Sequence, residues 1–303
     1  MCIRDRTSLA EGKTKRILKG PEPHTVVLQA VNRLTGGDAA RVAEINEIGA
    51  FKTEQAANCF QLLAAAGIPT AFVSRQADHE LLCRDCDMLP IEFVVRRYAF
   101  GSYLKRAPEF RRDGAPHRFD DIVLEQFHKL SVVSAPAASE TVTMPENDAR
   151  DAFLRDGEWA EGVFTDPFIV PGEDAWQLYS AKAPVEGAPL LSIEPELSAA
   201  QLETILETIV RPTFDVLERA WAGIETVHGP VTLVDAKFEV GVDRETGAFL
   251  LADVVDNDSW RIWPGGDPGK QLDKQAFRDG QAESLVTENY KLVAALTRRF
   301  LED

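Results

Sequence analysis

Cysteine and long hydrophobic runs are both scarce in this sequence. Four cysteines in 303 residues do not suggest a disulfide framework, and the lone Cys83–Cys86 pair lacks the second pair of ligands that a zinc site needs. No apolar stretch approaches the ~20 residues that cross a bilayer, and no secretory leader opens the chain. These features favour reduced thiols in a cytoplasmic protein and exclude a membrane partner.

Basic residues are also in the minority. The chain has 33 Lys and Arg against 49 Asp and Glu, so its net charge is −16 at pH 7. Such a chain repels nucleic acid, and anionic ligands must bind at local clusters of Lys and Arg. The five histidines show no metal-ligand spacing, and the long glycine-rich spacing of a P-loop is missing as well.

The most informative charges lie in residues 251–278, LADVVDNDSWRIWPGGDPGKQLDKQAFR. This stretch holds five Asp, two Lys and two Arg, with Trp260, Ile262 and Trp263 among them. Acids and bases held together beside aromatic side chains indicate a site that handles a metal and anionic ligands at once.

The preceding residues 231–242 alternate as a strand does, which places Asp235, Lys237 and Glu239 on one face. Turn formers at 243–247 predict a hairpin in which Val242 pairs with Ala248. Asp253 would then lie opposite Lys237 and diagonal to Glu239. Two carboxylates around a lysine would form a platform for Mg²⁺ and a nucleotide. The alternative is a solvated sheet face with cross-strand ion pairs.

Two further segments carry basic residues beside glycine. In EGKTK, Gly12 lets backbone approach a phosphate, and Lys13 and Lys15 project from one strand face. In VVRRYAFGSYLKR, Arg96 follows a buried strand and Ser102 is predicted to cap a helix whose free N–H groups face an anion. An arginine with a helix N-terminus suits a phosphate monoester. A solvated edge and a basic helix start are the respective alternatives.

Periodicity predicts the coarse layout. It favours a hairpin at 8–31, a helix at 43–66, strands at 70–74 and 90–96, and a final helix at 281–301. Ser198 and Gln201 form a capping box that opens another helix, and Pro212 should kink or split that helix. Strands and helices are grouped rather than alternating, so the fold class is α+β.

Several segments resemble the SAICAR synthetase family of purine biosynthesis. Their sequences are most similar in type to the synthetase half of the animal bifunctional enzyme. The segments are EGKTKRI, GGDAAR, FQLLAAAGIPTAF, MLPIEFVVRRYAFGSYLKR, DAKFEVG, LADVVDNDSWRIWPGGD and DKQAFRD. Together they cover roughly 9–106 and 200–303 in the expected order, whereas residues 1–7 do not match the family.

The resemblance implies a two-lobed fold. It predicts a nucleotide-binding lobe with an antiparallel sheet at 1–92 and a larger lobe for substrate and metal at 93–303, built around a central antiparallel hairpin. Residues 130–197 are atypical and rich in Ala, Pro, Ser and Glu. They are interpreted as an extended insertion with some local structure, mainly loops over the active-site side. Deletion of much of 131–164 should then be tolerated structurally.

The implied reaction uses ATP and Mg²⁺ to join 5-amino-1-(5-phospho-ribosyl)imidazole-4-carboxylate to L-aspartate. An acyl phosphate is the expected intermediate, with ADP and phosphate as products. The partners are therefore small molecules, without nucleic acid or membrane, and homo-oligomerisation stays open.

The family pattern also assigns residues. It implies that ATP is bound by Gly12, Lys13, Lys15, Met88, Glu92 and Lys129. It implies that the ribotide and aspartate are bound by Asp38, Arg96, Ser102, Arg261, Lys274 and Arg278. It implies that Lys237 and Asp235 are catalytic and that Glu239 and Asp253 bind Mg²⁺.

Two other classes remain open on sequence alone. A small-molecule kinase on a related scaffold would release ADP without aspartate. A non-catalytic nucleotide-binding protein is the other class, and the intact set of charged residues speaks against it.

Overall fold

The computed structural model describes residues 6–12, 14–36, 41–272, 274, 277 and 282–302. Its contacts divide the chain into two units, which interleave along the sequence. Unit 1 comprises Met1–Met88, Arg211–Leu233 and Phe238–Asp303, and unit 2 comprises Leu89–Val210 and Val234–Lys237. The predicted boundary at 92/93 lies near the first break, but most of the residues after 210 belong to unit 1. The division into consecutive lobes 1–92 and 93–303 therefore does not describe these contacts.

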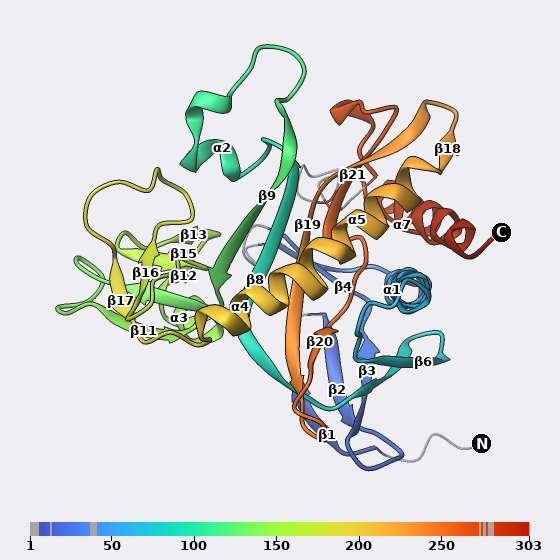
Figure 1. Cartoon of the computed structure of the whole chain (residues 1–303), viewed down its shortest axis with the longest axis horizontal. Helices are drawn as coiled ribbons and strands as arrows, with labels where there is room; N and C mark the ends of the chain where they lie inside the picture. Colours follow the sequence, from blue (N-terminus) through green and yellow to red (C-terminus); the bar gives the residue numbers. More distant parts are fainter. Residues whose placement is uncertain are drawn as a thin grey trace. The chain divides into compact units, whose positions relative to one another are not determined.

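Unit 1 contains an antiparallel sheet of five strands near the N-terminus (Figure 1). In sheet order the strands are β1 (Ser8–Glu11), β2 (Lys15–Lys19), β3 (Thr25–Ala30), β7 (Glu80–Arg84) and β6 (Phe72–Ala77). The predicted hairpin around Gly12 is present: β1 pairs with β2, and the Gly12 N–H donates to the Lys15 carbonyl at 2.8 Å. A second hairpin joins β4 (Arg33–Gly36) to β5 (Arg41–Glu44).

Two helices of unit 1 pack against each other, α1 (Ile48–Ala65) and α7 (Glu283–Arg298). The predicted start of α1 at residue 43 was wrong, because β5 continues to Glu44 and left-handed Glu47 (φ 63°) precedes the first turn. Helix α1 also contacts β3 and β6 of the sheet. Ile48 and Tyr290 are fully buried in one core cluster between the two helices. Their contact ties the N-terminal and C-terminal thirds of the chain into one unit.

The central hairpin of unit 1 has a register that differs from the predicted one. Its strands are β19 (Gly229–Asp243) and β20 (Phe249–Ala252), flanked by β18 (Glu225–Thr226) and β21 (Trp260–Pro264), both paired with β19. Val242 pairs with Phe249, so the predicted pairing of Val242 with Ala248 was wrong by one residue. A longer β20 would place Asp253 across from buried Phe238. Instead β20 ends at Ala252 and Asp253 turns away with φ 59°, because burying an unpaired carboxylate is costly.

Both faces of β19 are largely buried. Phe238 and Val240 are 1% and 0% exposed, as the alternation predicts. On the opposite face, however, Asp235 and Glu239 are only 4% and 7% exposed. The interpretation of this face as a solvated row of charges is therefore wrong for the two acids, whose side chains must be paired or hydrogen-bonded to be stable there.

Unit 2 contains an antiparallel sheet with the order β8, β9, β15, β16, β17. These strands are Cys86–Tyr98, Arg118–His128, Phe168–Val170, Trp176–Tyr179 and Leu191–Ile193. Strands β8 and β9 are joined through the short helix α2 (Tyr103–Arg106) and a 3₁₀ turn, Pro108–Phe110. Strand β19 contributes residues 234–237 to this unit.

The predicted insertion is folded rather than made of loops (Figure 1). Besides β15, β16 and β17 it contains the following elements: β10 (Leu130–Val133), β11 (Val142–Pro145), α3 (Glu146–Phe153), β12 (Leu154–Arg155), β13 (Glu158–Trp159) and β14 (Val163–Thr165). Strand β10 is the centre of a three-stranded sheet, and Val132 and Val133 are both 0% exposed. Because a deletion of 131–164 would remove this buried strand, the expectation that it is tolerated is contradicted by the structure.

The capping box at the start of α4 (Ala199–Ile205) is confirmed. The Gln201 N–H donates to Ser198 Oγ at 3.3 Å, and the Ser198 N–H donates to Gln201 Oε1 at 3.0 Å. Five residues of π-helix, Leu206–Val210, then lead into α5 (Arg211–Ala222). Pro212 lacks the N–H that the preceding turn would accept, and the widened turn accommodates it. No helix among the described residues is both long and apolar enough to span a membrane.

His128 at the end of β9 gives the fold a pH-dependent contact. Its side chain is 6% exposed, and Nε2 lies 3.3 Å from Oε1 of Glu196. Burial lowers the pKa of His128 below 6.5, although Glu196 acts in the opposite direction. The unfolded chain therefore binds the proton more readily than the folded protein, so the contribution to stability is complete above the unfolded pKa and decreases as the pH falls.

We expect His128→Gln to reduce the loss of unfolding free energy between roughly pH 7 and 5. Urea unfolding of both proteins across this range would measure the difference. The matched control is His24→Gln, because His24 is exposed. Equal pH slopes for His128→Gln and the unmodified protein would contradict the expectation.

Candidate active site

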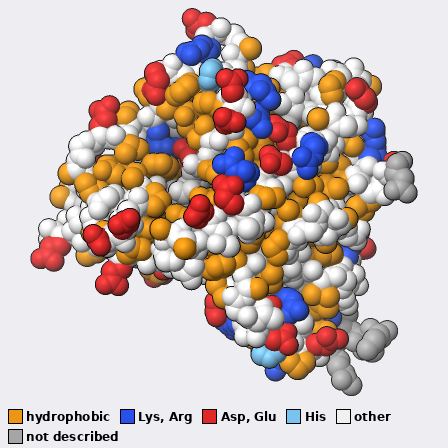
Figure 2. All heavy atoms as spheres, in the orientation of Figure 1, with side chains coloured by type: hydrophobic (Ala, Val, Ile, Leu, Met, Phe, Trp, Pro, Cys, Tyr) orange, Lys and Arg blue, Asp and Glu red, His pale blue; other side chains and the backbone are white. Residues whose placement is uncertain are grey.

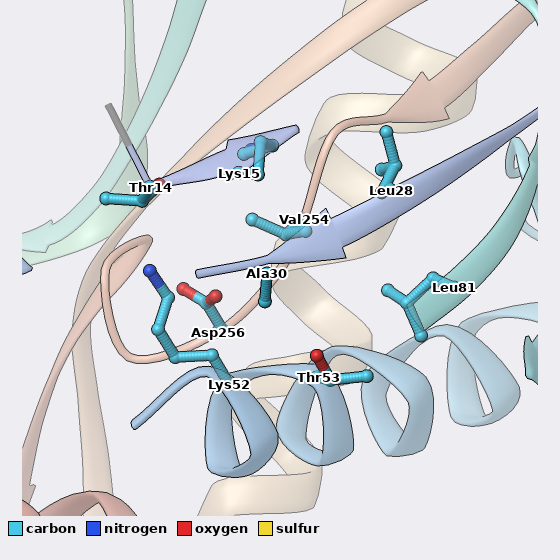
Figure 3. Close-up of a pocket in the computed structure, with 9 residues that line it drawn as sticks. All are labelled: Thr14, Lys15, Leu28, Ala30, Lys52, Thr53, Leu81, Val254 and Asp256. Atoms are coloured by element: carbon cyan, nitrogen blue, oxygen red, sulfur yellow. The ribbon is translucent and has the colours of Figure 1, made fainter. Parts of the chain in front are cut away.

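A pocket in unit 1 lies between the N-terminal sheet, helix α1 and the loop that follows β20 (Figure 3). It is lined by Thr14, Lys15, Leu28, Ala30, Lys52, Thr53, Leu81, Val254 and Asp256. The apolar side chains come from β3, β7 and the loop, whereas Lys15 and Lys52 bring two ammonium groups. A pocket with an apolar wall and two cations suits a ligand that carries both a ring and an anion.

Two predicted residues meet beside this pocket. The ammonium group of Lys15 on β2 contacts the carboxylate of Asp253, which directly follows β20. Across the hairpin, Glu239 pairs with Ala252, the residue before Asp253. The structure therefore brings a predicted phosphate-binding lysine to a predicted metal ligand, and it places the second metal ligand at a neighbouring position of the hairpin.

Lys52 on α1 belongs to a buried ionic network of the same unit. Its side chain is 4% exposed and its Nζ lies 2.7 Å from Oδ2 of Asp258. Lys274 Nζ lies 3.4 Å from the same oxygen, and the Tyr290 hydroxyl donates to Oδ1 at 2.7 Å. Burial alone would raise the pKa of Asp258, but the charges of Lys274 and Lys52 and these hydrogen bonds lower it. Asp258 therefore stays ionised at neutral pH.

The neighbouring acid, Asp256, behaves differently. It is 1% exposed, and burial raises its pKa to about 6 against the charge of Lys52. Figure 3 shows the Lys52 ammonium and the Asp256 carboxylate pointing toward each other. The backbone N–H of Asp258 also donates to Asp256 Oδ1 at 2.8 Å. The pocket thus holds a carboxyl group that can exchange a proton near neutral pH.

Unit 2 contains a second cluster, formed by Arg96, Arg106, Glu125 and Asp235. Arg96 Nε donates to Glu125 Oε2 at 2.5 Å, and Nη1 donates to Asp235 Oδ2 at 2.8 Å. The other oxygen of Glu125 accepts from Arg106. All four side chains are 4 to 6% exposed. Two guanidinium groups and two carboxylates alternate, so the buried charges compensate one another.

Lys237 lies on β19 two residues beyond Asp235. Its Nζ is 2.6 Å from Oε1 of Glu92 on β8, and the two side chains are 36% and 19% exposed. The structure therefore brings together the predicted catalytic lysine and a residue predicted to bind ATP. The Lys237 side chain is more exposed than those of Arg96 and Arg106. A bound ligand can therefore reach Lys237 more easily than either arginine.

Comparison with known proteins places this arrangement in a family. A model of the family described as SAICAR synthetase matches residues 8–142 and 189–295. The chain belongs to the SAICAR synthetase family. It is 36% identical over 298 residues to the phosphoribosylaminoimidazole-succinocarboxamide synthase of Chloroflexus aurantiacus, which covers 96% of each chain. The chicken multifunctional protein ADE2 is 34% identical over 290 residues, and the match covers 94% of this chain but only 56% of that protein.

Solved SAICAR synthetases share the fold. One of them, a type-2 enzyme in complex with ADP, has a TM-score of 0.65 at 21% identity and covers 95% of this chain and 96% of its own. The prediction of an α+β fold of the SAICAR synthetase type is thereby confirmed. In keeping with its family, the chain is an ATP-dependent ligase of purine biosynthesis.

The other residues suggested by the SAICAR synthetase pattern occupy varied positions. Met88 on β8 is 42% exposed, Gly12 and Lys129 are exposed, and Arg261 on β21 is half-buried. Lys274 contacts Asp258, as described above. Lys13, Asp38 and Arg278 lie outside the described residues.

A helix begins after Ser102 as predicted, but the predicted cap by the Ser102 side chain was wrong. Helix α2 has only four residues, and Ser102 makes no capping hydrogen bond with its side chain. Its backbone is already helical, with φ −65° and ψ −22°, whereas a capping serine normally has extended dihedral angles. A helix this short offers little dipole to an anion, so any role of Ser102 depends on its hydroxyl alone.

Sequence reasoning missed Lys52, Asp258 and Glu125. One signal was available for Lys52, which lies four residues after Ile48 and so falls on the buried face of α1, where a lysine needs a partner. Asp256 and Asp258 lay within the highlighted stretch 251–278, but their roles depend on which distant cations they meet. Nothing in the spacing of Glu125 or Arg106 indicated their contact with Arg96.

The thiols of the isolated Cys83–Cys86 pair are free. Burial raises the pKa of Cys83 to about 12 and that of Cys86 to about 11. Thiolate is therefore scarce at neutral pH, and neither residue is primed for redox chemistry.

Proposed function

We propose that this chain joins the carboxylate of 5-amino-1-(5-phospho-ribosyl)imidazole-4-carboxylate to the amine of L-aspartate at the expense of ATP. The contact between Lys15 and Asp253 beside the pocket carries the proposal, because it brings the two kinds of charge that a nucleotide–metal site needs to one place. A carboxylate is a poor electrophile, so it is first phosphorylated to an acyl phosphate. The amine of aspartate then attacks the acyl carbon and phosphate leaves.

The nucleotide belongs in the pocket of unit 1. Its apolar wall contacts the base or ribose, and Lys15 and Lys52 face the phosphates. The ADP bound to a solved relative supports nucleotide use. Phosphoryl transfer requires positioning and charge neutralisation more than a protein nucleophile, which agrees with a site rich in ionic side chains.

Glu239 and Asp253 fit a Mg²⁺ ion. Both offer carboxylate oxygens from neighbouring positions of one hairpin, and Mg²⁺ is usually held by one or two carboxylates together with substrate phosphates. When bound, the ion would neutralise charge on the phosphates. Lys15 then serves as the cation that orients the same phosphates, and its present contact with Asp253 keeps it beside them.

We assign the ribotide phosphate to Arg96, with Ser102 and Arg261 as further contacts. Asp235 accepts a hydrogen bond from Arg96, so its part is to orient that guanidinium group. Lys237 neutralises the carboxylate that is phosphorylated, and Lys274 with Arg278 receive the carboxylates of aspartate. A cytoplasmic location is part of the proposal, and the free thiols of the described cysteines agree with it.

Purified protein incubated with ATP, Mg²⁺, the carboxylated ribotide and aspartate tests the proposal. We expect the succinocarboxamide to form in equal amount with ADP, and omission of aspartate to stop amide formation. Sustained ADP release with the ribotide alone would instead indicate a small-molecule kinase. Absence of product with all four components would overturn the proposal.

Asp253→Asn should raise the Mg²⁺ concentration needed for half-maximal activity by about ten- to a hundredfold, because one carboxylate ligand is lost. Initial rates against Mg²⁺ at saturating ATP would measure the shift. The matched control is Asp121→Asn, since Asp121 is exposed in unit 2 and lies outside the pocket. An unchanged Mg²⁺ dependence would remove Asp253 from the metal site.

A further inference from the structure

Arg106 joins the buried guanidinium cluster of unit 2 to the insertion. At one end it donates from Nη2 to Glu125, the carboxylate that also accepts from Arg96. At the other end its Nη1 donates to the backbone carbonyl of Ala181 at 2.6 Å. One guanidinium group therefore bonds the cluster and a segment of the insertion at the same time.

Besides Tyr103, whose ring centre lies 6.0 Å away, two phenylalanine rings contact the same guanidinium group. Its central carbon lies 4.9 Å from the ring centre of Phe127 on β9 and 5.2 Å from that of Phe168 on β15. The rings are register partners with centres 5.6 Å apart and a tilt of 62°. Arginine over an aromatic face is attracted by the ring quadrupole, more strongly where water is excluded.

The contacts made by the insertion come from outside the part of the chain that the family model matches. Phe168 and Ala181 both lie in 143–188, the segment that the SAICAR synthetase family model leaves unmatched. Arg106, Glu125 and Arg96 lie inside the matched region. The insertion thus supplies one aromatic ring and one carbonyl to a residue of the family scaffold.

We propose that Arg106 is a positioning residue through which the insertion orients Arg96 for the ribotide phosphate. This inference rests on the proposed function, in which Arg96 binds that phosphate. The carbonyl of Ala181 in the insertion accepts a hydrogen bond from Arg106. Arg106 in turn donates to one oxygen of Glu125, and the other oxygen of Glu125 accepts from Nε of Arg96. Among the described residues, Arg96 donates two of its five N–H groups, one to Glu125 and one to Asp235. The two carboxylates thereby set the direction in which its other N–H groups can meet a phosphate.

Loss of Arg106 would leave one oxygen of buried Glu125 without its cation. Because the cluster is shielded from water, Glu125 would satisfy that oxygen by turning toward Arg96, the nearest remaining guanidinium group. Arg96 would then rotate with it. Binding of the ribotide phosphate would therefore weaken, whereas the nucleotide site of unit 1 would stay unchanged.

The test compares Arg106→Gln, Arg106→Lys and Phe168→Leu with the control Arg155→Gln. Arg155 lies in the insertion and donates to backbone carbonyls at 2.7 to 3.1 Å. Steady-state kinetics give KM for the ribotide, KM for ATP and kcat, and circular dichroism gives the melting temperature. A double-mutant cycle with Arg96→Lys measures the coupling.

We expect Arg106→Gln to raise the ribotide KM by about ten- to a hundredfold, with the ATP KM within about twofold. Arg106→Lys keeps the positive charge but not the planar guanidinium group. Its ribotide KM should therefore lie between that of the unmodified protein and that of Arg106→Gln. Phe168→Leu should raise the ribotide KM by about threefold, and Arg155→Gln should leave it unchanged. In the Arg96→Lys background, Arg106→Gln should have little further effect on KM.

A purely structural role predicts a different result. A lower melting temperature with an unchanged ribotide KM, or equal rises in both KM values, would overturn the proposal, as would additive effects in the cycle. If Arg106→Gln does not fold, the same comparison of ribotide KM with ATP KM in Arg106→Lys and Phe168→Leu tests the proposal. Failure of the unmodified protein to form the succinocarboxamide would overturn the proposed ligase function itself, whereas an active protein whose Arg106 variants keep their ribotide KM would refute only the positioning role.

Discussion

Replacement of Lys237 by alanine should lower kcat by about a hundred- to a thousandfold, because the variant lacks a cation aimed at charge that develops during phosphoryl transfer. The melting temperature should hardly change. Lys237 is 36% exposed and its pair with Glu92 is partly solvated, and such pairs contribute only about 0–1 kcal/mol to stability. Initial rates of amide formation, with a thermal melt of the same preparation, measure both quantities.

Lys291→Ala is the matched control for Lys237→Ala. Lys291 on α7 is 61% exposed and forms a weak pair with Glu288 at 4.0 Å, so this variant should keep full turnover. Lys237→Arg should remain impaired, because a planar guanidinium group does not reproduce a compact ammonium charge. Turnover close to that of the unmodified protein in Lys237→Ala would remove the residue from the mechanism.

Asp258→Asn should lower the free energy of unfolding by about 3–5 kcal/mol, because it leaves the ammonium group of Lys52 buried without its closest partner. Lys52 is 4% exposed and Asp258 is 17% exposed, so water compensates little. Lys274 and Tyr290 lose part of their bonding as well. Urea unfolding at neutral pH measures the change, and Asp121→Asn serves again as an exposed control.

Two further results would identify the buried pair as the cause. The double variant Lys52→Met with Asp258→Asn should lose less stability than the sum of the single variants, since the two closest partners are removed together. The pKa of Asp258 is lowered in the folded protein, so its stabilisation is present above the unfolded pKa and is lost as the pH falls. The gap between Asp258→Asn and the unmodified protein should therefore narrow in acid. A constant gap would contradict this explanation.

Local patterns in the sequence predicted the local structure well. The alternation in 231–242 identified the strand that carries Asp235, Lys237 and Glu239, and Ser198 with Gln201 identified a helix start. The hairpin register was wrong because it depends on how far β20 continues. A single left-handed residue, Asp253, ends that strand, and asparagine and aspartate tolerate this conformation without an unusual sequence signal.

The insertion shows the limit of composition as a guide. Its Ala, Pro, Ser and Glu content suggested loops, yet Val132 and Val133 form the buried centre of a sheet. Short strands of three or four residues leave little periodicity to detect, and the pairing of β10 with β14 spans about thirty residues of chain. The surface in Figure 2 shows a related point: acidic and basic side chains are interspersed on the face in view, which the net charge alone does not reveal.

The sequence by itself determined the family, the fold class, and which segments carry the acids and bases of the site, because motifs and short-range periodicity are properties of neighbouring residues. Only the tertiary structure decided which charges meet. Lys52 and Asp258 are 206 residues apart, and Arg96 and Asp235 are 139 apart. Burial and charge compensation act through space, so the partners of these side chains and the pKa values that follow arise only when the chain has folded.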